Sequence, residues 1–127
     1  MAKAQTACTS AQALLALGDT DGAANRAYYA MFDAARAALL SSIAQVDSEI
    51  GRTHSGLIGA FGSHLVKTGL VSRDLGRQLN RAHEIRLIAD YTDGSVELSD
   101  VRELVSQAAQ FVAAMQIAFL PGTTPTD

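Results

Sequence analysis

The spacing of apolar residues follows the period of an α-helix along almost the whole chain. No block of alternating β-branched residues predicts a strand. Five segments carry the helical period, at about residues 6–17, 21–44, 54–67, 72–91 and 99–120. We therefore expect an all-α fold, built as a single antiparallel helical bundle of four to five helices.

The ends of these segments carry residues that typically begin or end helices. Gly18 and Gly69 follow two of the predicted helices, and Ser72 is placed to cap the fourth. Thr20 or Asp21 is expected to cap the second helix, and Ser99 or Asp100 the last.

The chain length of 127 residues fits one domain with one core. We expect a single helical domain over residues 1–120 and a flexible C-terminal tail, "PGTTPTD", over residues 121–127. The sequence contains no internal repeat and no low-complexity linker that would divide it.

Charge and cysteine content limit the classes of function. Ten basic and thirteen acidic residues give a net charge of −3, so the chain as a whole does not favour a polyanion. Cys8 is the only cysteine, which suits a reducing compartment. The N-terminal apolar run is too short for a membrane span and lacks a signal-peptide layout, so we expect a cytoplasmic protein without a membrane partner.

Metal and cofactor chemistry is not favoured by the sequence. The three histidines, His54, His64 and His83, have no metal-ligand spacing with one another or with Cys8. The glycines of "RTHSGLIGAFG" match no phosphate-loop pattern. We therefore expect no metal site and no cofactor.

The second predicted helix has two different faces. Tyr28 and Phe32 lie on an apolar side, where plain core packing is the favoured interpretation. Arg26 lies among small residues on the other side, with Tyr29 at its margin, and core packing and a polar network are equally consistent with Tyr29. A helix apolar on one side and small on the other is expected to pack on both, at the centre of the bundle.

Arg86 occupies a place where an apolar side chain is expected. On a helical wheel with Leu75 at zero, it falls at roughly 20°, in the middle of the apolar face. A charge there needs a partner or a ligand, because burying it alone is costly. Asp90 and His83 complete a stripe with it at spacings of three and four residues. The stripe is either an internal ion pair with His83 at its rim, or an acid/base and phosphate-binding site.

A second, basic stripe follows the opposite face of the same helix. It consists of Arg73, Arg77 and Arg81. Residues 67–86 hold five of the ten basic residues and two acids, a local balance of +3. This stripe is either an RNA-attracting surface or an ordinary solvated face, and the solvated face is slightly favoured.

Three segments, taken together, resemble a known family. "ANRAYYAMFDAARAALL", "RTHSGLIGAFGSHLVKTGL" and "LGRQLNRAHEIRLIADY" are similar, in order and spacing, to the HEPN domain (higher eukaryotes and prokaryotes nucleotide-binding), especially its small stand-alone bacterial branch. The resemblance covers residues 22–91. It implies a helical bundle, commonly a homodimer, often encoded beside a minimal nucleotidyltransferase as a toxin and antitoxin pair.

The resemblance also implies an activity. Many members are metal-independent endoribonucleases with an Arg followed, after four to six residues, by a His in a pocket at the dimer interface. If Arg86 is the family arginine, Asp90 or Tyr91 stands at the histidine position. Arg77 and His83 offer another match, but Arg77 lies away from the apolar face.

Two functions from different classes follow from this resemblance. One is an RNA-cleaving toxin, with Arg86, Asp90, Tyr91 and His83 as candidate catalytic residues. The other is a non-catalytic module that binds a nucleotide or a partner. The candidate ligand-binding residues are Arg26, Tyr29, Arg77, Arg81 and His54. A purely structural role for the polar stripe, in a dimeric adaptor, is the third alternative.

Overall fold

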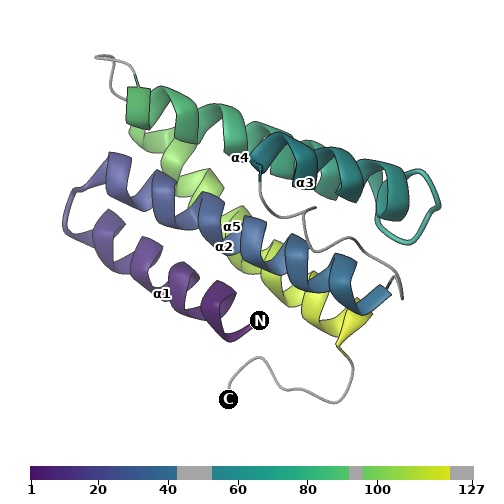
Figure 1. Ribbon diagram of the computed structural model, residues 1–127. Helices are drawn as coiled ribbons and strands as arrows, with labels where there is room; N and C mark the ends of the chain where they lie inside the picture. The colour runs from purple at the N-terminus through teal and green to yellow at the C-terminus, as the bar shows by residue number, and fades with distance from the viewer. Residues whose placement is uncertain (43–52, 92–95, 121–127) are drawn as a thin grey trace.

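The structure of the protein is a computed structural model that describes residues 1–42, 53–91 and 96–120. Within these ranges five α-helices and one π-helical turn follow one another (Figure 1). They are α1 (Ala2–Ala16), α2 (Thr20–Ser42), α3 (His54–Phe61), η2 (Gly62–Val66), α4 (Arg73–Tyr91) and α5 (Leu98–Phe119). The predicted all-α bundle is confirmed, although the first helix begins at Ala2 rather than at residue 6. The predicted tail, residues 121–127, lies outside the described residues.

The helix boundaries follow local backbone chemistry. Gly18 has φ +86° after α1, and its N–H donates to the carbonyl of Leu15 at 3.1 Å, as in the left-handed end of a helix. The cap of α2 is Asp19, whose Oδ1 accepts from Gly22 N at 2.9 Å, and not Thr20 or Asp21 as predicted. Ser72 caps α4 as predicted, because its Oγ accepts from the N–H of Leu75.

The last helix begins slightly earlier than the sequence indicates. Helix α5 starts at Leu98, after Glu97, which makes no side-chain capping hydrogen bond. The predicted caps, Ser99 and Asp100, therefore lie within its first turn. There the negative charge of Asp100 interacts favourably with the positive end of the helix dipole. No helix in the described part of the chain has the length and apolar character needed to cross a bilayer.

Helix α2 is the centre of the bundle, as its two-faced pattern predicts. It packs against α1, α3, α4 and α5. Figure 1 shows α1 and α2 as antiparallel neighbours joined at Gly18, and α3 and α4 side by side on the other side of α2. The bundle therefore has two different contacts along one helix, one with α1 and α5 and one with α3 and α4.

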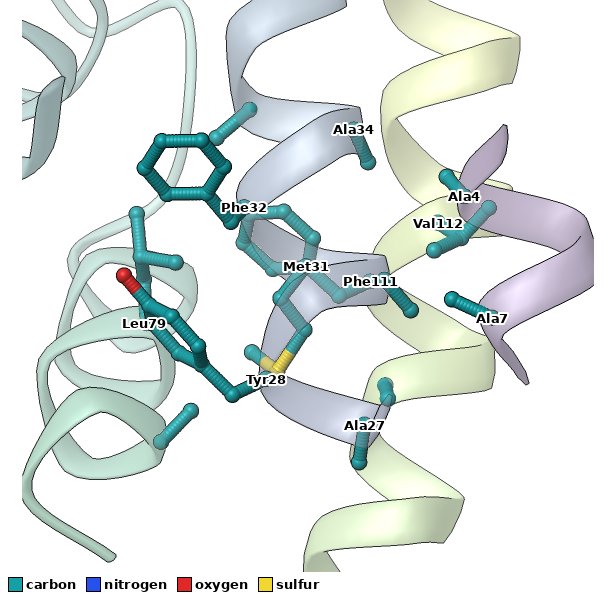
Figure 2. Packing of buried hydrophobic residues seen from close by; sticks show 14 of the residues in the cluster. Ala4, Ala7, Ala27, Tyr28, Met31, Phe32, Ala34, Leu79, Phe111 and Val112 are labelled. Carbon is teal, nitrogen blue, oxygen red and sulfur yellow. The ribbon is translucent and has the colours of Figure 1, made fainter. Parts of the chain in front are cut away.

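The side of α2 that faces α1 and α5 consists mainly of alanine. Figure 2 shows Ala27 and Ala34 directed toward the side where α1 and α5 lie, while Tyr28 points toward α4. Ala27 and Ala34 are fully buried, as are Ala4 and Ala11 of α1. Because these side chains are short, the backbones of α1 and α2 approach each other closely and exclude water over a long contact.

A close contact also fixes α3 and η2 against α4. A Cβ atom at Gly76 of α4 would lie 3.1 Å from Cγ2 of Val66, so the missing side chain allows the two segments to approach. Thr53 caps α3, with its side chain accepting from Gly56 N at 3.0 Å. Together these contacts place His54, the first residue of α3, against the middle of α4.

Candidate functional site

Arg86 is buried in the middle of the apolar face of α4, as its wheel position predicts. Only 9% of its surface is exposed. The carbon of its guanidinium lies 5.6 Å from the ring centres of Tyr28 and of Tyr29. Two aromatic rings of α2 thus stabilise the cation through their electron-rich faces.

The charge of Arg86 is paired with Asp90, one helical turn further along α4. Nε of Arg86 lies 2.8 Å from Oδ2 of Asp90, which is the contact predicted from the spacing. The N–H does not point along that line, so the contact is an ion pair rather than a well-aligned hydrogen bond. The terminal amino groups of Arg86 donate no hydrogen bond to any residue in the described ranges. They remain available to an anion.

A polar chain extends from Asp90 to α2. Nδ2 of Asn25 donates to Oδ2 of Asp90 at 3.3 Å. Oδ1 of Asn25 accepts from Nε and Nη2 of Arg26 at 3.2 Å and 2.9 Å. Arg26 therefore reaches Asp90 through Asn25, and no hydrogen bond in the described part of the chain joins Arg26 to Arg86. Sequence reasoning missed Asn25, because nothing in the sequence of α2 alone shows that it faces α4.

Two histidines from different helices stack beside this charge. The rings of His54 in α3 and His83 in α4 lie 5.9 Å apart with an angle of 20° between their planes. Both rings also contact Tyr28, with ring centres 5.4 Å and 5.5 Å away. The structure thus brings His54 next to His83 and Arg86, which the sequence already places on one stripe of the same helix.

Tyr28 fixes the orientation of His54. Its hydroxyl lies 2.6 Å from Nδ1 of His54. Burial raises the pKa of Tyr28, against a smaller lowering by Arg86, so the phenol stays protonated. We assign the hydroxyl as the donor, because it has no other hydrogen-bond partner in the described part of the chain. The proton of neutral His54 then resides on Nε2.

This role corrects the prediction that Tyr28 is a plain core residue. Its ring is fully buried, as expected, but its hydroxyl belongs to the polar cluster. The sequence does not indicate this hydrogen bond. Tyr28 lies one turn from Phe32 in an apolar stripe, and its partner, His54, comes from another helix.

Both imidazoles are held in the neutral form. Burial, followed by the positive charge of Arg86, lowers the pKa of His54, and His83 adds a smaller effect. Burial and Arg86 also lower the pKa of His83, while Glu84 partly opposes them. Nδ1 of His83 is enclosed and has no hydrogen-bond partner among the described residues. Nε2 is therefore the nitrogen of His83 that can exchange a proton with a ligand.

Tyr29 and Tyr91 border the cluster. Tyr29 is half-buried, and its ring also lies 5.1 Å from the guanidinium of Arg26, which supports the polar-network interpretation. Tyr91 is 73% exposed, with its ring 5.9 Å from the guanidinium of Arg86. Both rings therefore border the guanidinium of Arg86.

The basic stripe lies apart from this cluster. Arg77 pairs with Asp74 at 3.0 Å, and both side chains are well exposed. Arg81 lies 3.6 Å from Asp100 of α5. No hydrogen bond or ion pair within the described ranges joins Arg77 or Arg81 to the cluster. In the same ranges no three His, Cys, Asp or Glu side chains are placed to share a metal ion.

The arrangement resembles a phosphate site with proton-transfer groups beside it. A fixed cation with free N–H donors binds a phosphate oxygen, and neutral imidazoles near a cation are suited to exchange protons near pH 7. Asp90 and Asn25 hold the arginine in place, and Tyr28 holds His54. These three residues position the groups that would meet a ligand.

Comparison with known proteins places this site in context. A family model described as the HEPN domain matches residues 1–118. A UPF0332 protein of Gloeobacter violaceus is 38% identical, over 77% of this chain and 73% of its own length. A UPF0332 protein of Thermotoga maritima is 32% identical, over 90% of this chain and 83% of its own length. A Methanocaldococcus jannaschii protein that bears the name "Putative toxin" is 31% identical, over 68% of this chain and 61% of its own length.

Proposed function

The chain belongs to the HEPN domain family, and from this premise we propose that it is a toxin that cleaves RNA as a metal-independent endoribonuclease. The proposal rests on one observation. The buried guanidinium of Arg86 has free N–H donors, and its positive charge lowers the pKa values of two neutral imidazoles, His54 and His83. The relative from Methanocaldococcus jannaschii named as a toxin supports the biological role.

Each group has a distinct part in the proposed reaction. The terminal N–H groups of Arg86 bind the scissile phosphate and stabilise the charge that develops on it. Nε2–H of His54, oriented by Tyr28, donates a hydrogen bond to a phosphate oxygen. Nε2 of His83 accepts the proton of the 2′-hydroxyl as the 2′ oxygen attacks phosphorus. The resulting imidazolium then gives that proton to the 5′ oxygen as the P–O5′ bond breaks, which leaves a 2′,3′-cyclic phosphate and a 5′-hydroxyl.

Asp90 is a positioning residue in this proposal. If Arg86 is the family arginine, Asp90 or Tyr91 stands at the histidine position of the motif, and the structure pairs Asp90 with Arg86 at 2.8 Å. A carboxylate in contact with a guanidinium is a weak proton shuttle near neutral pH. The proton-transfer role therefore passes to His83, which approaches Arg86 from the preceding turn of α4.

The second candidate function is a non-catalytic HEPN module that binds a nucleotide or a partner. The presence of Asp90 at the motif histidine position favours it, because the same Arg86 site would then recognise a phosphate without cleaving it. RNA binding without cleavage would support this alternative over the first.

We also propose that the site is completed by a second copy of the chain. Leu87 and Tyr91 on α4 and Leu98 on α5 are exposed by 37%, 73% and 42%. Large apolar side chains beside a charged site suit a surface that another subunit covers. A minimal nucleotidyltransferase is the proposed antitoxin partner. Light scattering at micromolar concentration should give a dimer, and a strictly monomeric protein would contradict this assembly.

The direct test is RNA cleavage in the presence of a chelator. Purified protein should cleave single-stranded RNA in EDTA and leave 2′,3′-cyclic phosphate ends. His83→Ala should abolish cleavage but keep RNA binding, whereas Arg77→Ala, on the basic stripe, should cleave normally. Failure of the wild type to cleave any RNA with or without a metal ion would refute the nuclease, and cleavage that requires an added metal ion would refute the proposed chemistry.

A further inference from the structure

A groove runs between α1 and α2, with Tyr29 among its lining residues. Its volume is about 400 Å³, within the usual range for small-ligand sites. The side chains that matter for a ligand are Lys3, Thr6 and Ser10 of α1 and Arg26, Tyr29 and Asp33 of α2. The groove therefore combines two cations, two hydroxyls, one aromatic ring and one carboxylate.

Asp33 is the unusual member of this set. It is partly buried and forms no hydrogen bond or ion pair in the described part of the chain. Burial raises its pKa, and the charges of Lys3, Arg36, the N-terminal amine and Arg26 oppose that rise. A partly buried carboxylate without a donor is unfavourable, so a ligand that brings N–H groups to it gains more than it would at an exposed acid.

Tyr29 links the groove to the Arg86 site, because its ring lies near the guanidinium groups of both Arg26 and Arg86. The ring of Tyr29 lies 5.1 Å from the guanidinium of Arg26 and 5.6 Å from that of Arg86. Arg26 is held by Asn25, which also donates to Asp90. The same aromatic ring thus borders both sites, and a polar chain joins Arg26 of the groove to Asp90 beside Arg86.

The chemistry of the groove matches one nucleotide of a single strand. An aromatic ring with adjacent guanidinium groups stacks on nucleobases and neutralises phosphates. A carboxylate selects among bases by the donors on their edges. Guanine alone presents two adjacent N–H donors on its Watson–Crick edge, at N1 and at the exocyclic amine, and a carboxylate accepts both.

We propose that the groove between α1 and α2 is a base-binding subsite for single-stranded RNA, selective for guanine, with Asp33 as the specificity-determining residue. Its place in RNA cleavage rests on the proposed function, because the scissile phosphate would lie at Arg86 and the guanine would belong to a neighbouring nucleotide. Binding of a free nucleotide in the groove does not depend on cleavage. Thr6 and Ser10 supply hydroxyls for the ribose or the base, and Lys3 and Arg26 supply the charge for its phosphate.

The test measures the affinity of the four ribonucleoside 5′-monophosphates by isothermal titration calorimetry. GMP should bind about tenfold more tightly than AMP, CMP or UMP, the discrimination typical of a two-point contact. Asp33→Asn should remove this preference, because an amide offers one acceptor and one donor to two donors. Thr6→Phe, which fills the groove from the exposed face of α1, should weaken all four nucleotides. Asp74→Asn, which removes the same charge from the surface of α4, is the matched control and should bind as the wild type does.

The outcomes separate this subsite from the nuclease. Arg86→Ala should retain the preference for GMP even where RNA cleavage is lost, since the groove does not contain Arg86. A wild type that prefers GMP but cleaves no RNA would refute the proposed function and leave the subsite in place. Equal affinities for the four nucleotides, or an unchanged preference for GMP in Asp33→Asn, would overturn the subsite. Circular dichroism of each variant establishes that the helices are retained.

Discussion

The two long sides of α2 are built from different side chains and serve different purposes. Toward α1 and α5 the helix presents alanines such as Ala27 and Ala34, which are fully buried and carry no polar atom beyond the backbone. Toward α3 and α4 it presents Tyr28 and Phe32, whose rings surround His54 at 5.4 Å and 4.9 Å. One side is closed by close backbone packing, and the other holds polar groups among aromatic rings.

The difference shows which side of α2 mainly stabilises the fold and which side holds the candidate functional groups. Where buried alanines such as Ala27 and Ala34 pack, no side chain carries a polar group that needs a partner, so this contact is sensitive mainly to side-chain size. The aromatic side encloses Nδ1 of His83 without a partner and Arg86 with free terminal donors. Such incompletely satisfied groups reduce stability and are typical of sites built for a ligand.

The largest effect is expected from Arg86→Ala, which removes the cation from the aromatic side. RNA cleavage should fall about 100- to 1,000-fold, as for loss of one charge-stabilising donor. The melting temperature should change little, because Asp90 is 26% exposed at its side chain and keeps Asn25 as a donor. Cleavage assays and thermal unfolding of the same preparation measure both effects.

The control for this prediction is the Arg86→Ala, Asp90→Ala double variant. If Arg86 were a structural partner of Asp90, the single change should cost about 3–5 kcal/mol of unfolding free energy, and the double change should restore it. That pattern would show that the polar groups on the aromatic side of α2 are structural as well.

Ala34→Leu tests the other side of α2. Three added carbon atoms in a fully closed contact should lower the free energy of unfolding by about 1–3 kcal/mol, measured by urea unfolding. Cleavage per folded molecule should stay as in the wild type. Ala13→Leu, at an exposed position of α1, makes the same change without the contact and should be nearly neutral. Equal stability of the two variants would show that the alanine side is not closely packed.

Tyr28→Phe separates the packing role of this residue from its polar role, because it keeps the buried ring and removes only the hydroxyl. The lost hydrogen bond to His54 should cost about 1 kcal/mol of stability. It should also raise the pKa of His54, since the hydroxyl bonds to the neutral imidazole. Histidine NMR titration measures this pKa, with Tyr29→Phe as the matched control. An unchanged titration of His54 would contradict the assigned donor.

The smallest expected effect is the dependence of stability on pH. The pKa values of His54 and His83 are lowered in the folded state, so below about pH 6.5 the unfolded chain binds more protons than the folded one. The free energy of unfolding should therefore decrease as the pH falls through that value toward the folded pKa values, and level off above it. The double variant His54→Gln, His83→Gln should show a shallower dependence in urea unfolding at several pH values. An identical slope would show that folding does not shift the pKa values of these imidazoles.

The helices and the centre of the bundle could be predicted from sequence, because their signals are local. The helical period predicts each of the five helices, and the two-faced pattern of the second places it between neighbours. Arg86 was found in the same way, since a wheel shows which residues share a face. Its pairing with Asp90 follows from their spacing of four residues.

The cap residues were less predictable. Asp19, Thr20 and Asp21 are all plausible caps by composition, and only the observed hydrogen bond to Gly22 selects Asp19. A helix boundary depends on single hydrogen bonds, whereas the existence of a helix depends on many residues at once. Helices are therefore easier to predict from sequence than their cap residues.

By itself, the sequence determined the all-α bundle, the central helix and a cation on an apolar face, because each depends on periodicity within one helix. Only the tertiary structure decided that His54 joins His83, that Tyr28 orients it and that Asn25 links Arg26 to Asp90. The physical reason is that these contacts cross between helices. Their geometry is set by the close approach of α4 to η2 at Gly76 and by the packing angle of α2, and neither is encoded in the period of any single segment.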